Sequence, residues 1–254
     1  MNTVYIKIIT QLKDNYSFVI YSKKNNNSIV VDPAEATSHI KFIKENNLNL
    51  HSIYITHHHK DHTAGVTDLL KTFSQTLVYS PDKSIYGTTH ILTNNNAISN
   101  PINKFQVIIT PGHTLDHIIY YDENNGVLFC GDTLFRLGCG RVFEGTLNEM
   151  FNSLKKINEL SKNTIIYCGH EYTIGNLNFL EKTLKKESAY LTVRKKINDD
   201  LNNKGKSVPF LLEDEKQYNL FLNQNSKLGN IIKKELAFTD FELFAYLRKA
   251  KASF

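Results

Sequence analysis

Short blocks of hydrophobic residues separated by polar turns run through the first two thirds of the chain, a pattern typical of alternating strands and helices. The strand-like blocks are rich in Val, Ile, Tyr and Phe and are bounded by Asn, Asp, Gly or Pro. They predict strands at 4–9, 16–22, 28–32, 51–56, 76–80, 105–110, 117–122, 127–131 and 164–168. Apolar residues at helical spacing predict helices at 35–47, 63–73 and 147–160.

The pattern changes near residues 171–175, after which it predicts helices at about 175–203, 213–223 and 240–250 and no strand. A chain of 254 residues can form one large domain, or one of ordinary size with a small companion. We therefore expect a mixed α/β domain over 1–172 and a helical domain over 173–254.

Composition is that of a globular protein, since 41% of the residues are hydrophobic and 22% are charged. No apolar run approaches the roughly 18–20 residues that span a bilayer. Three cysteines are too few for a disulfide framework and fit a reducing compartment. Cys130 and Cys168 lie in apolar strands and are expected in the core, whereas Cys139, between two glycines, is expected to be more exposed. Because the sequence opens on a strand-like segment without a secretory signal pattern, we expect a cytoplasmic protein.

The net charge of +5 is concentrated in the last third of the chain. Residues 1–174 carry 15 basic and 15 acidic groups, and residues 175–254 carry 15 basic and 10 acidic groups. A nucleic acid, an anionic surface or a small anionic substrate would each explain such an excess. On charge alone, a solvated helical surface is the favoured interpretation.

Metal-binding side chains gather where the strand at 51–56 ends. Four histidines and one aspartate occur within six residues, at positions 57–62. Clustered imidazoles are costly to bury as mere packing material. Alternation lets His57 and His59 point the same way while His58 points elsewhere, so His58 is not expected to be a ligand. One tetrahedral ion could not use His57, His59, Asp61 and His62 and still keep a place for water, whereas two adjacent ions could.

Three later strands end in the same manner. His113, Asp132 and His170 each follow an apolar strand, with a glycine directly before the ligand. A glycine there lets the backbone approach closely. Loops at one end of a sheet sandwich would bring these residues together, and Asp132 is the natural bridging carboxylate.

The His-x-His-x-Asp-His pattern at 57–62, with its later ligands, resembles the metallo-β-lactamase superfamily. Within it the chain resembles the glyoxalase II family, the hydroxyacylglutathione hydrolases. The matching segments are 56–62, 110–114, 129–135, 138–141, 144–146 and 168–173. The resemblance extends through the helical tail to 247–251. It implies an αββα sandwich followed by a small C-terminal helical domain.

The resemblance also implies two divalent metal ions per chain. Zinc is the expected ion, with iron and manganese as alternatives, because histidine and carboxylate ligands suit all three. One ion would take His57, His59 and His113, the other would take Asp61, His62 and His170, and Asp132 would bridge them.

The implied activity is metal-dependent hydrolysis of S-D-lactoylglutathione and related 2-hydroxyacylglutathiones to D-lactate and glutathione, the second step of methylglyoxal detoxification. A metal-bound hydroxide would attack the thioester, held in place by Asp61 and Asp132. The positions that match the family's glutathione contacts are Arg141, Phe143, Tyr172, Arg248 and Lys251. We expect no nucleic-acid or membrane partner, and a monomer or weak homo-oligomer.

Two departures from the family pattern stand near these residues. Phe143 lacks the hydroxyl of the tyrosine in mammalian-type members, and Asp116 stands where glycine is usual. The alternatives are another hydrolase or dioxygenase of the superfamily, or a binding protein that kept the fold. A β-lactamase usually has cysteine where Asp132 stands, a persulfide dioxygenase usually lacks the helical tail, and a nuclease would carry extra domains. The intact set of seven ligands argues against a binding protein.

Overall fold

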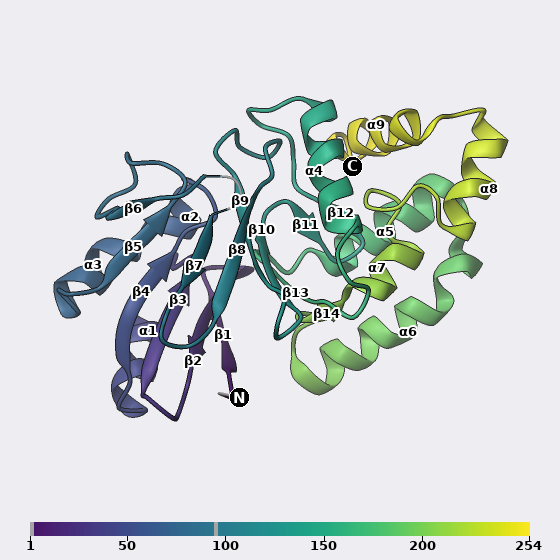
Figure 1. Ribbon diagram of the computed structural model, residues 1–254. Coiled ribbons are helices and arrows are strands. Elements are labelled where there is room, and N and C mark those ends of the chain that lie inside the picture. The colour runs from purple at the N-terminus through teal and green to yellow at the C-terminus, as the bar shows by residue number, and fades with distance from the viewer. Residues whose placement is uncertain (1–2, 94–95) are drawn as a thin grey trace. The chain divides into compact units, whose positions relative to one another are not determined.

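The computed structural model describes residues 3–93 and 96–254, which form two compact units (Figure 1). Unit 1 comprises Met1–Ile109 and Asp116–Gly131, and unit 2 comprises Thr110–Leu115 and Asp132–Phe254. The predicted domain boundary between residues 172 and 173 falls inside unit 2 and stays a prediction.

The first sheet of unit 1 mixes antiparallel and parallel strands. Strands β1 to β3 pair antiparallel, and β3 to β6 pair parallel. These strands are β1 (Tyr5–Gln11), β2 (Asn15–Tyr21), β3 (Asn27–Val31), β4 (Asn49–Tyr54), β5 (Leu77–Ser80) and β6 (His90–Ile91). Its helices are α1 (Thr37–Glu45), α2 (Lys60–Thr63) and α3 (Val66–Thr72). Parallel pairing requires the long crossover connections that contain these helices.

A second, antiparallel set of strands faces the first sheet. It consists of β7 (Ala97–Ser99), β8 (Lys104–Ile109), β9 (Ile118–Asp122) and β10 (Val127–Gly131). Aromatic rings join the two layers, with Phe18 5.3 Å from Phe129 and Tyr54 5.1 Å from Tyr120 between ring centroids. Strand β2 is therefore buried on both faces and reads as a continuous apolar run.

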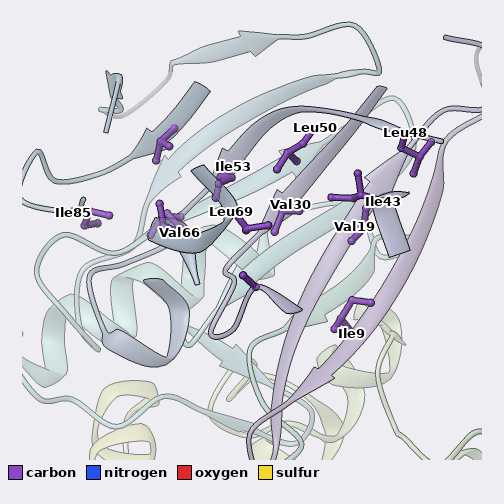
Figure 2. Packing of buried hydrophobic residues seen from close by; sticks show 13 residues of the cluster. Ile9, Val19, Val30, Ile43, Leu48, Leu50, Ile53, Val66, Leu69 and Ile85 are labelled. Atoms are coloured by element: carbon purple, nitrogen blue, oxygen red, sulfur yellow. The ribbon is translucent and has the colours of Figure 1, made fainter. Parts of the chain in front are cut away.

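Aliphatic side chains bury the other face of the first sheet (Figure 2). Val19, Val30 and Ile53 of the sheet belong to one buried cluster with Ile43 of α1 and Leu69 of α3. This cluster fixes β3 and β4, and therefore the loop that follows β4.

Unit 2 contains the remaining strands and most of the helices. Strand β11 (Leu134–Phe135) forms a hairpin with β12 (Gly138–Cys139), and β13 (Ile165–Cys168) pairs antiparallel with β14 (Phe210–Leu211). The helices are α4 (Leu147–Asn158), α5 (Thr173–Leu184), α6 (Glu187–Lys204), α7 (Leu212–Tyr218), α8 (Lys227–Leu236) and α9 (Asp240–Ala252). Capping boxes start α4 at Thr146 and α9 at Thr239. Phe244 of α9 packs against Phe151 of α4, with ring centroids 5.4 Å apart.

The nine predicted strands are confirmed, but the helices differ in detail. The helix predicted at 175–203 is two helices, because Lys185 takes a left-handed conformation with φ of 50° and ends α5. The helix predicted at 63–73 is α3, which begins at Val66, and the short helix α2 precedes it. Helix α8 was not predicted, and β14 is a strand in the region where none was expected. Among the described residues, no helix is both long and apolar enough to cross a membrane.

Candidate active site

The loop after β4 brings two imidazole nitrogens together in unit 1. His57 Nε2 and His59 Nδ1 lie 3.1 Å apart. Two nitrogens that bind one tetrahedral ion at about 2.0–2.1 Å would be separated by roughly 3.3–3.4 Å. The observed separation therefore suits two ligands of the same ion.

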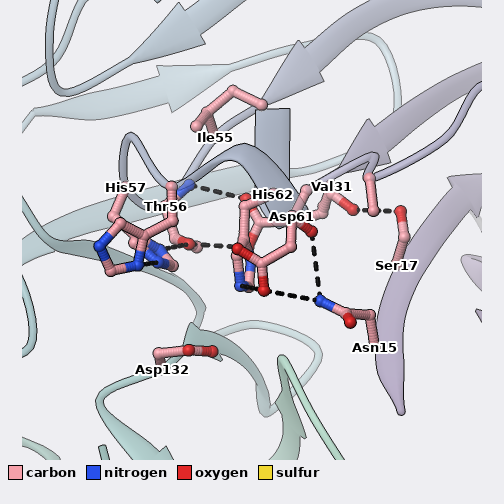
Figure 3. A network of polar contacts seen from close by, with 12 residues as sticks. Asn15, Ser17, Val31, Ile55, Thr56, His57, Asp61, His62 and Asp132 are labelled. Atoms are coloured by element: carbon pink, nitrogen blue, oxygen red, sulfur yellow. Dashed lines mark hydrogen bonds and ion pairs between the residues drawn. The ribbon is translucent and has the colours of Figure 1, made fainter. Parts of the chain in front are cut away.

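Buried polar groups orient the candidate ligand residues of this loop (Figure 3). His62 Nδ1 donates to Asp32 Oδ2 over 3.0 Å, which directs Nε2 toward Asp61, 3.8 Å from its Oδ2. The Asp32 carboxylate also accepts from the backbone N and the hydroxyl of Thr56, at 2.8 and 2.7 Å. Asn15 donates to Asp61 Oδ2 over 3.0 Å. Such outer contacts fix the tautomer and orientation of metal ligands.

Sequence reasoning missed Asp32 and Asn15 as members of the site. Asp32 follows the buried strand β3 directly, which is the same strand-end signal that indicated the candidate ligands. Asn15 lies 46 residues from Asp61, and no local pattern joins the two. His58 Nδ1 lies 3.0 Å from Asp116 Oδ1, so the unusual aspartate pairs with the histidine that was not expected to be a ligand.

In unit 2, one carboxylate oxygen faces two imidazoles. Asp132 Oδ2 lies 3.4 Å from His113 Nε2 and 3.3 Å from His170 Nε2. Both separations exceed the usual hydrogen-bond length and suit ligands that share an ion. His113 Nδ1 lies 2.8 Å from the carbonyl of Arg141 and must donate to it, because a carbonyl only accepts. Nε2 of His113 then presents its lone pair toward Asp132.

The donor chemistry of the two ligand sets suits a divalent metal. Each set combines imidazole nitrogens with carboxylate oxygens, a mixture that zinc, iron and manganese accept. The cysteines Cys130, Cys139 and Cys168 are all buried and reduced. The expectation of a more exposed Cys139 is wrong: it is 3% exposed, and burial raises the pKa of its thiol.

Unit 2 also contains a pocket with a volume of about 440 Å³. Four of the five residues expected to bind glutathione line it: Arg141, Tyr172, Arg248 and Lys251. Phe143, the fifth, is not in the lining. Its side chain is 58% exposed, and its ring lies 5.2 Å from His113 and 5.6 Å from the guanidinium of Arg141.

The two basic residues of α9 in this pocket differ in their surroundings. Arg248 is 7% exposed, and its Nη1 donates to the carbonyls of Cys139 and Gly140 at 3.0 and 3.3 Å. Lys251 Nζ is buried, lies 5.5 Å from the centroid of Phe179, and has no hydrogen-bond acceptor among residues 3–93 and 96–254. Burial lowers the pKa of Lys251 to about 8, and the nearby charge of Arg248 adds to that effect.

Aromatic stacking joins His170, a candidate ligand residue, to the pocket. The rings of His170 and Tyr172 stack with centroids 4.7 Å apart and an interplanar angle of 4°. The ring of Phe135 meets Tyr172 edge-on, with centroids 5.0 Å apart. Tyr172 therefore contacts both His170 and the wall of the pocket.

Comparisons with known proteins identify the family to which the chain belongs. The family model "Metallo-beta-lactamase superfamily" matches residues 12–170, and the chain belongs to that superfamily. The model "Hydroxyacylglutathione hydrolase C-terminus" matches residues 171–254. Among curated relatives, the hydroxyacylglutathione hydrolase of Citrobacter koseri is 39% identical over 97% of this chain and 98% of its own length. That of Salmonella paratyphi C is 40% identical over the same shares of both chains.

Within the superfamily, the chain thus belongs to the hydroxyacylglutathione hydrolase family, as its sequence pattern predicts. The crystal structure of ETHE1 from Myxococcus xanthus has the same fold, with a TM-score of 0.66 over 98% of this chain and 99% of that one. At 20% identity this likeness concerns the fold alone. The expected fold class, a metallo-β-lactamase sandwich with a C-terminal helical region, is confirmed.

Proposed function

We propose that the protein hydrolyses S-D-lactoylglutathione, and related 2-hydroxyacylglutathiones, to D-lactate and glutathione. Its relatives of nearly equal length are named hydroxyacylglutathione hydrolases. This reaction is the second step of methylglyoxal detoxification. The observation that carries the substrate assignment is the buried ammonium of Lys251, which lines a pocket together with Arg141 and Arg248.

The pocket suits an anionic peptide-like ligand. Its volume of about 440 Å³ lies in the range of small-molecule sites. A buried ammonium is costly unless an anion pairs with it, and glutathione brings two carboxylates. The Tyr172 hydroxyl adds a donor and acceptor for the peptide groups. Phe143 has no hydroxyl, so we propose that it contributes only an apolar surface.

Two divalent ions, with zinc expected and iron or manganese as alternatives, complete the proposed site. The proposed ligands of one ion are His57, His59 and His113, those of the other are Asp61, His62 and His170, and Asp132 bridges them. The spacings of 3.1, 3.3 and 3.4 Å within the ligand pairs support this division. When bound, such ions would lower the pKa of a water and stabilise charge on the carbonyl oxygen.

The chain's own groups then orient the reaction. Asp61, restrained by Asn15, and Asp132 supply the acceptors that hold the attacking water. The leaving group is a thiolate, which departs without a strong acid. The pocket residues hold the glutathione half of the substrate, so that its thioester carbonyl is presented to the water.

Surface charge pairing supports a small anionic substrate over a nucleic acid. Many basic groups of the tail pair with acidic neighbours, for example Lys204 with Asp200 at 2.7 Å and Lys186 with Glu235 at 2.8 Å. Arg248 and Lys251 instead face the pocket. We propose a cytoplasmic enzyme, monomeric or weakly oligomeric, without nucleic-acid or membrane partners.

The test is thioester hydrolysis by the purified protein with S-D-lactoylglutathione as substrate. A chelator should abolish turnover, and added zinc, iron or manganese should restore it. The matched substrate control is the lactoyl thioester of N-acetylcysteamine, which keeps the reacting atoms but has no carboxylate. Equal kcat/KM for the two thioesters would contradict the glutathione assignment, and full activity after metal removal would contradict the mechanism.

A further inference from the structure

Glu171 stands between two residues of the proposed site and lines the pocket together with Tyr172. His170 and Tyr172 flank it in sequence, and their rings stack on each other. Because the backbone joins Glu171 directly to both residues, contacts that fix its side chain also restrain the orientation of its neighbours.

Ser207 holds both oxygens of the Glu171 carboxylate. Its backbone N donates to Oε2 over 2.7 Å, and its hydroxyl donates to Oε1 over 2.7 Å. Ser207 is 1% exposed and comes from the segment between α6 and β14. Two short hydrogen bonds to one carboxylate fix both its position and the rotation of the side chain that carries it.

A buried arginine anchors Ser207 in turn. Arg136 Nη1 donates to the Ser207 carbonyl over 2.9 Å and to Asp200 Oδ2 of α6 over 2.8 Å. The Arg136 carbonyl accepts from Asn176, which lines the pocket, over 2.9 Å. Asp200, Arg136, Ser207 and Glu171 thus form one continuous chain of contacts inside unit 2.

We propose that this chain of contacts, the Ser207–Glu171 clamp, is a positioning device that orients His170 and Tyr172 together. One element would then set both the direction of a metal ligand and the wall of the glutathione pocket. Ser207 does not line the pocket, so it acts through Glu171 and is a positioning residue. This inference rests on the proposed function, because it assigns His170 to a metal and Tyr172 to glutathione.

The test compares Ser207→Ala and Glu171→Gln with Ser80→Ala. Like Ser207, Ser80 is buried, and its hydroxyl donates to the backbone carbonyl of Asp82 over 2.8 Å. Unlike Ser207, it lies in β5 of unit 1. Four quantities are measured: ions kept per chain against a weak competing chelator, the Kd of unreactive S-methylglutathione, kcat with KM, and the unfolding midpoint.

Both clamp variants should lose one ion about 10–100-fold more readily than the wild type, the usual effect of removing an outer contact to a metal ligand. Their Kd for S-methylglutathione should rise about tenfold, and KM should rise with it. Ser80→Ala should keep ion retention and analogue affinity unchanged, even where its unfolding midpoint falls as far. A merely structural serine would lower the midpoint alone.

The outcomes separate this inference from the proposed function. A wild-type protein that neither keeps two ions nor hydrolyses the thioester overturns both. A wild-type protein that does both, with clamp variants that match Ser80→Ala in ion retention and analogue affinity, overturns the clamp alone. Ser207→Ala is the deciding variant, because Ser207 does not line the pocket whereas Glu171 does. It removes the hydroxyl, which bonds Glu171 and Thr173, and keeps the backbone bond to Glu171.

Discussion

Replacing Lys251 with methionine should raise KM while making the ligand-free protein more stable. These opposite effects have one cause, the burial of the Lys251 ammonium without an acceptor among the described residues. Burial lowers its pKa from the usual 10.5 to about 8. At pH 7 that difference corresponds to about 3 kcal/mol of destabilisation, at roughly 1.4 kcal/mol per pH unit. Methionine keeps the apolar stem over Phe179 and removes the charge.

The pH dependence of this destabilisation follows from proton binding to Lys251. Between about pH 8 and 10.5 the unfolded chain holds the Lys251 proton and the folded chain has lost it. The destabilisation is therefore fully present below pH 8 and fades as the pH rises through that window. The unfolding midpoint of Lys251→Met at pH 7 should exceed that of the wild type by several degrees, since about 1 kcal/mol shifts a chain of this size by roughly 2–4 °C.

Substrate affinity should fall in Lys251→Met, whereas stability should rise. A charge-assisted bond to a glutathione carboxylate contributes on the order of 1.5–3 kcal/mol, so KM should rise about tenfold or more. The turnover number should change much less, because the contact is made in the ground state and in the transition state alike. Thermal unfolding of the substrate-free protein and steady-state kinetics at pH 7 measure the two effects.

Lys249→Met is the matched control, because Lys249 is an exposed lysine on the same helix. It should leave both the midpoint and KM nearly unchanged. Arg248→Ala is a poorer test, since it also removes the bonds to the carbonyls of Cys139 and Gly140 and should lose stability as well as affinity. The reasoning is refuted if Lys251→Met behaves like Lys249→Met in KM and gains no stability.

Three further predictions concern the metals, the cysteines and a buried histidine. Asp132→Ala should weaken the binding of both ions, because Asp132 Oδ2 faces both His113 and His170. Elemental analysis measures the ions per chain, and a single reproducible equivalent in the reconstituted wild type would contradict a dinuclear site. Replacing Cys130, Cys139 or Cys168 singly with Ala should spare kcat apart from stability losses, and a trapped acyl-enzyme on any of them would overturn the mechanism. Burial lowers the pKa of His39 to about 4, so stability should be full above pH 6.5 and fall by about 3 kcal/mol as the pH drops toward 4. Urea unfolding at pH 7 and pH 5 should show a smaller difference in His39→Gln than in the wild type.

The longer strands could be predicted, and candidate ligand residues located, because their signals are local. A strand such as β10 shows an apolar run that ends in a glycine, and the ligand follows at once. Helix α8 gave no such signal, because Gly229 and Asn230 are poor helix formers. The fold favours glycine at position 229 because a side chain there would meet the backbone of Gln224. The Ser226 hydroxyl accepts a hydrogen bond from the Gly229 backbone N and so caps the helix.

Long-range contacts explain the remaining differences. Strand β14 has two residues and exists because β13 supplies its partner. Asn15 reaches Asp61 across 46 residues, and Ser207 reaches Glu171 across 36. None of these pairs leaves a periodic pattern in the sequence. Sequence reasoning therefore finds the atoms proposed to touch metal and misses the groups that hold those atoms in place.

The basic tail shows how the same residues change meaning once they are placed. From composition, the excess of cations after residue 175 suits a nucleic acid, an anionic surface or a small anion equally well. Exposed pairs such as Lys204 with Asp200 contribute little to stability and recognise nothing specific. The ammonium of Lys251 is different, because it is desolvated in a pocket before any ligand arrives. Its interaction with a bound carboxylate is not opposed by the loss of its own hydration, so a single buried lysine accounts for anion recognition better than the net charge does.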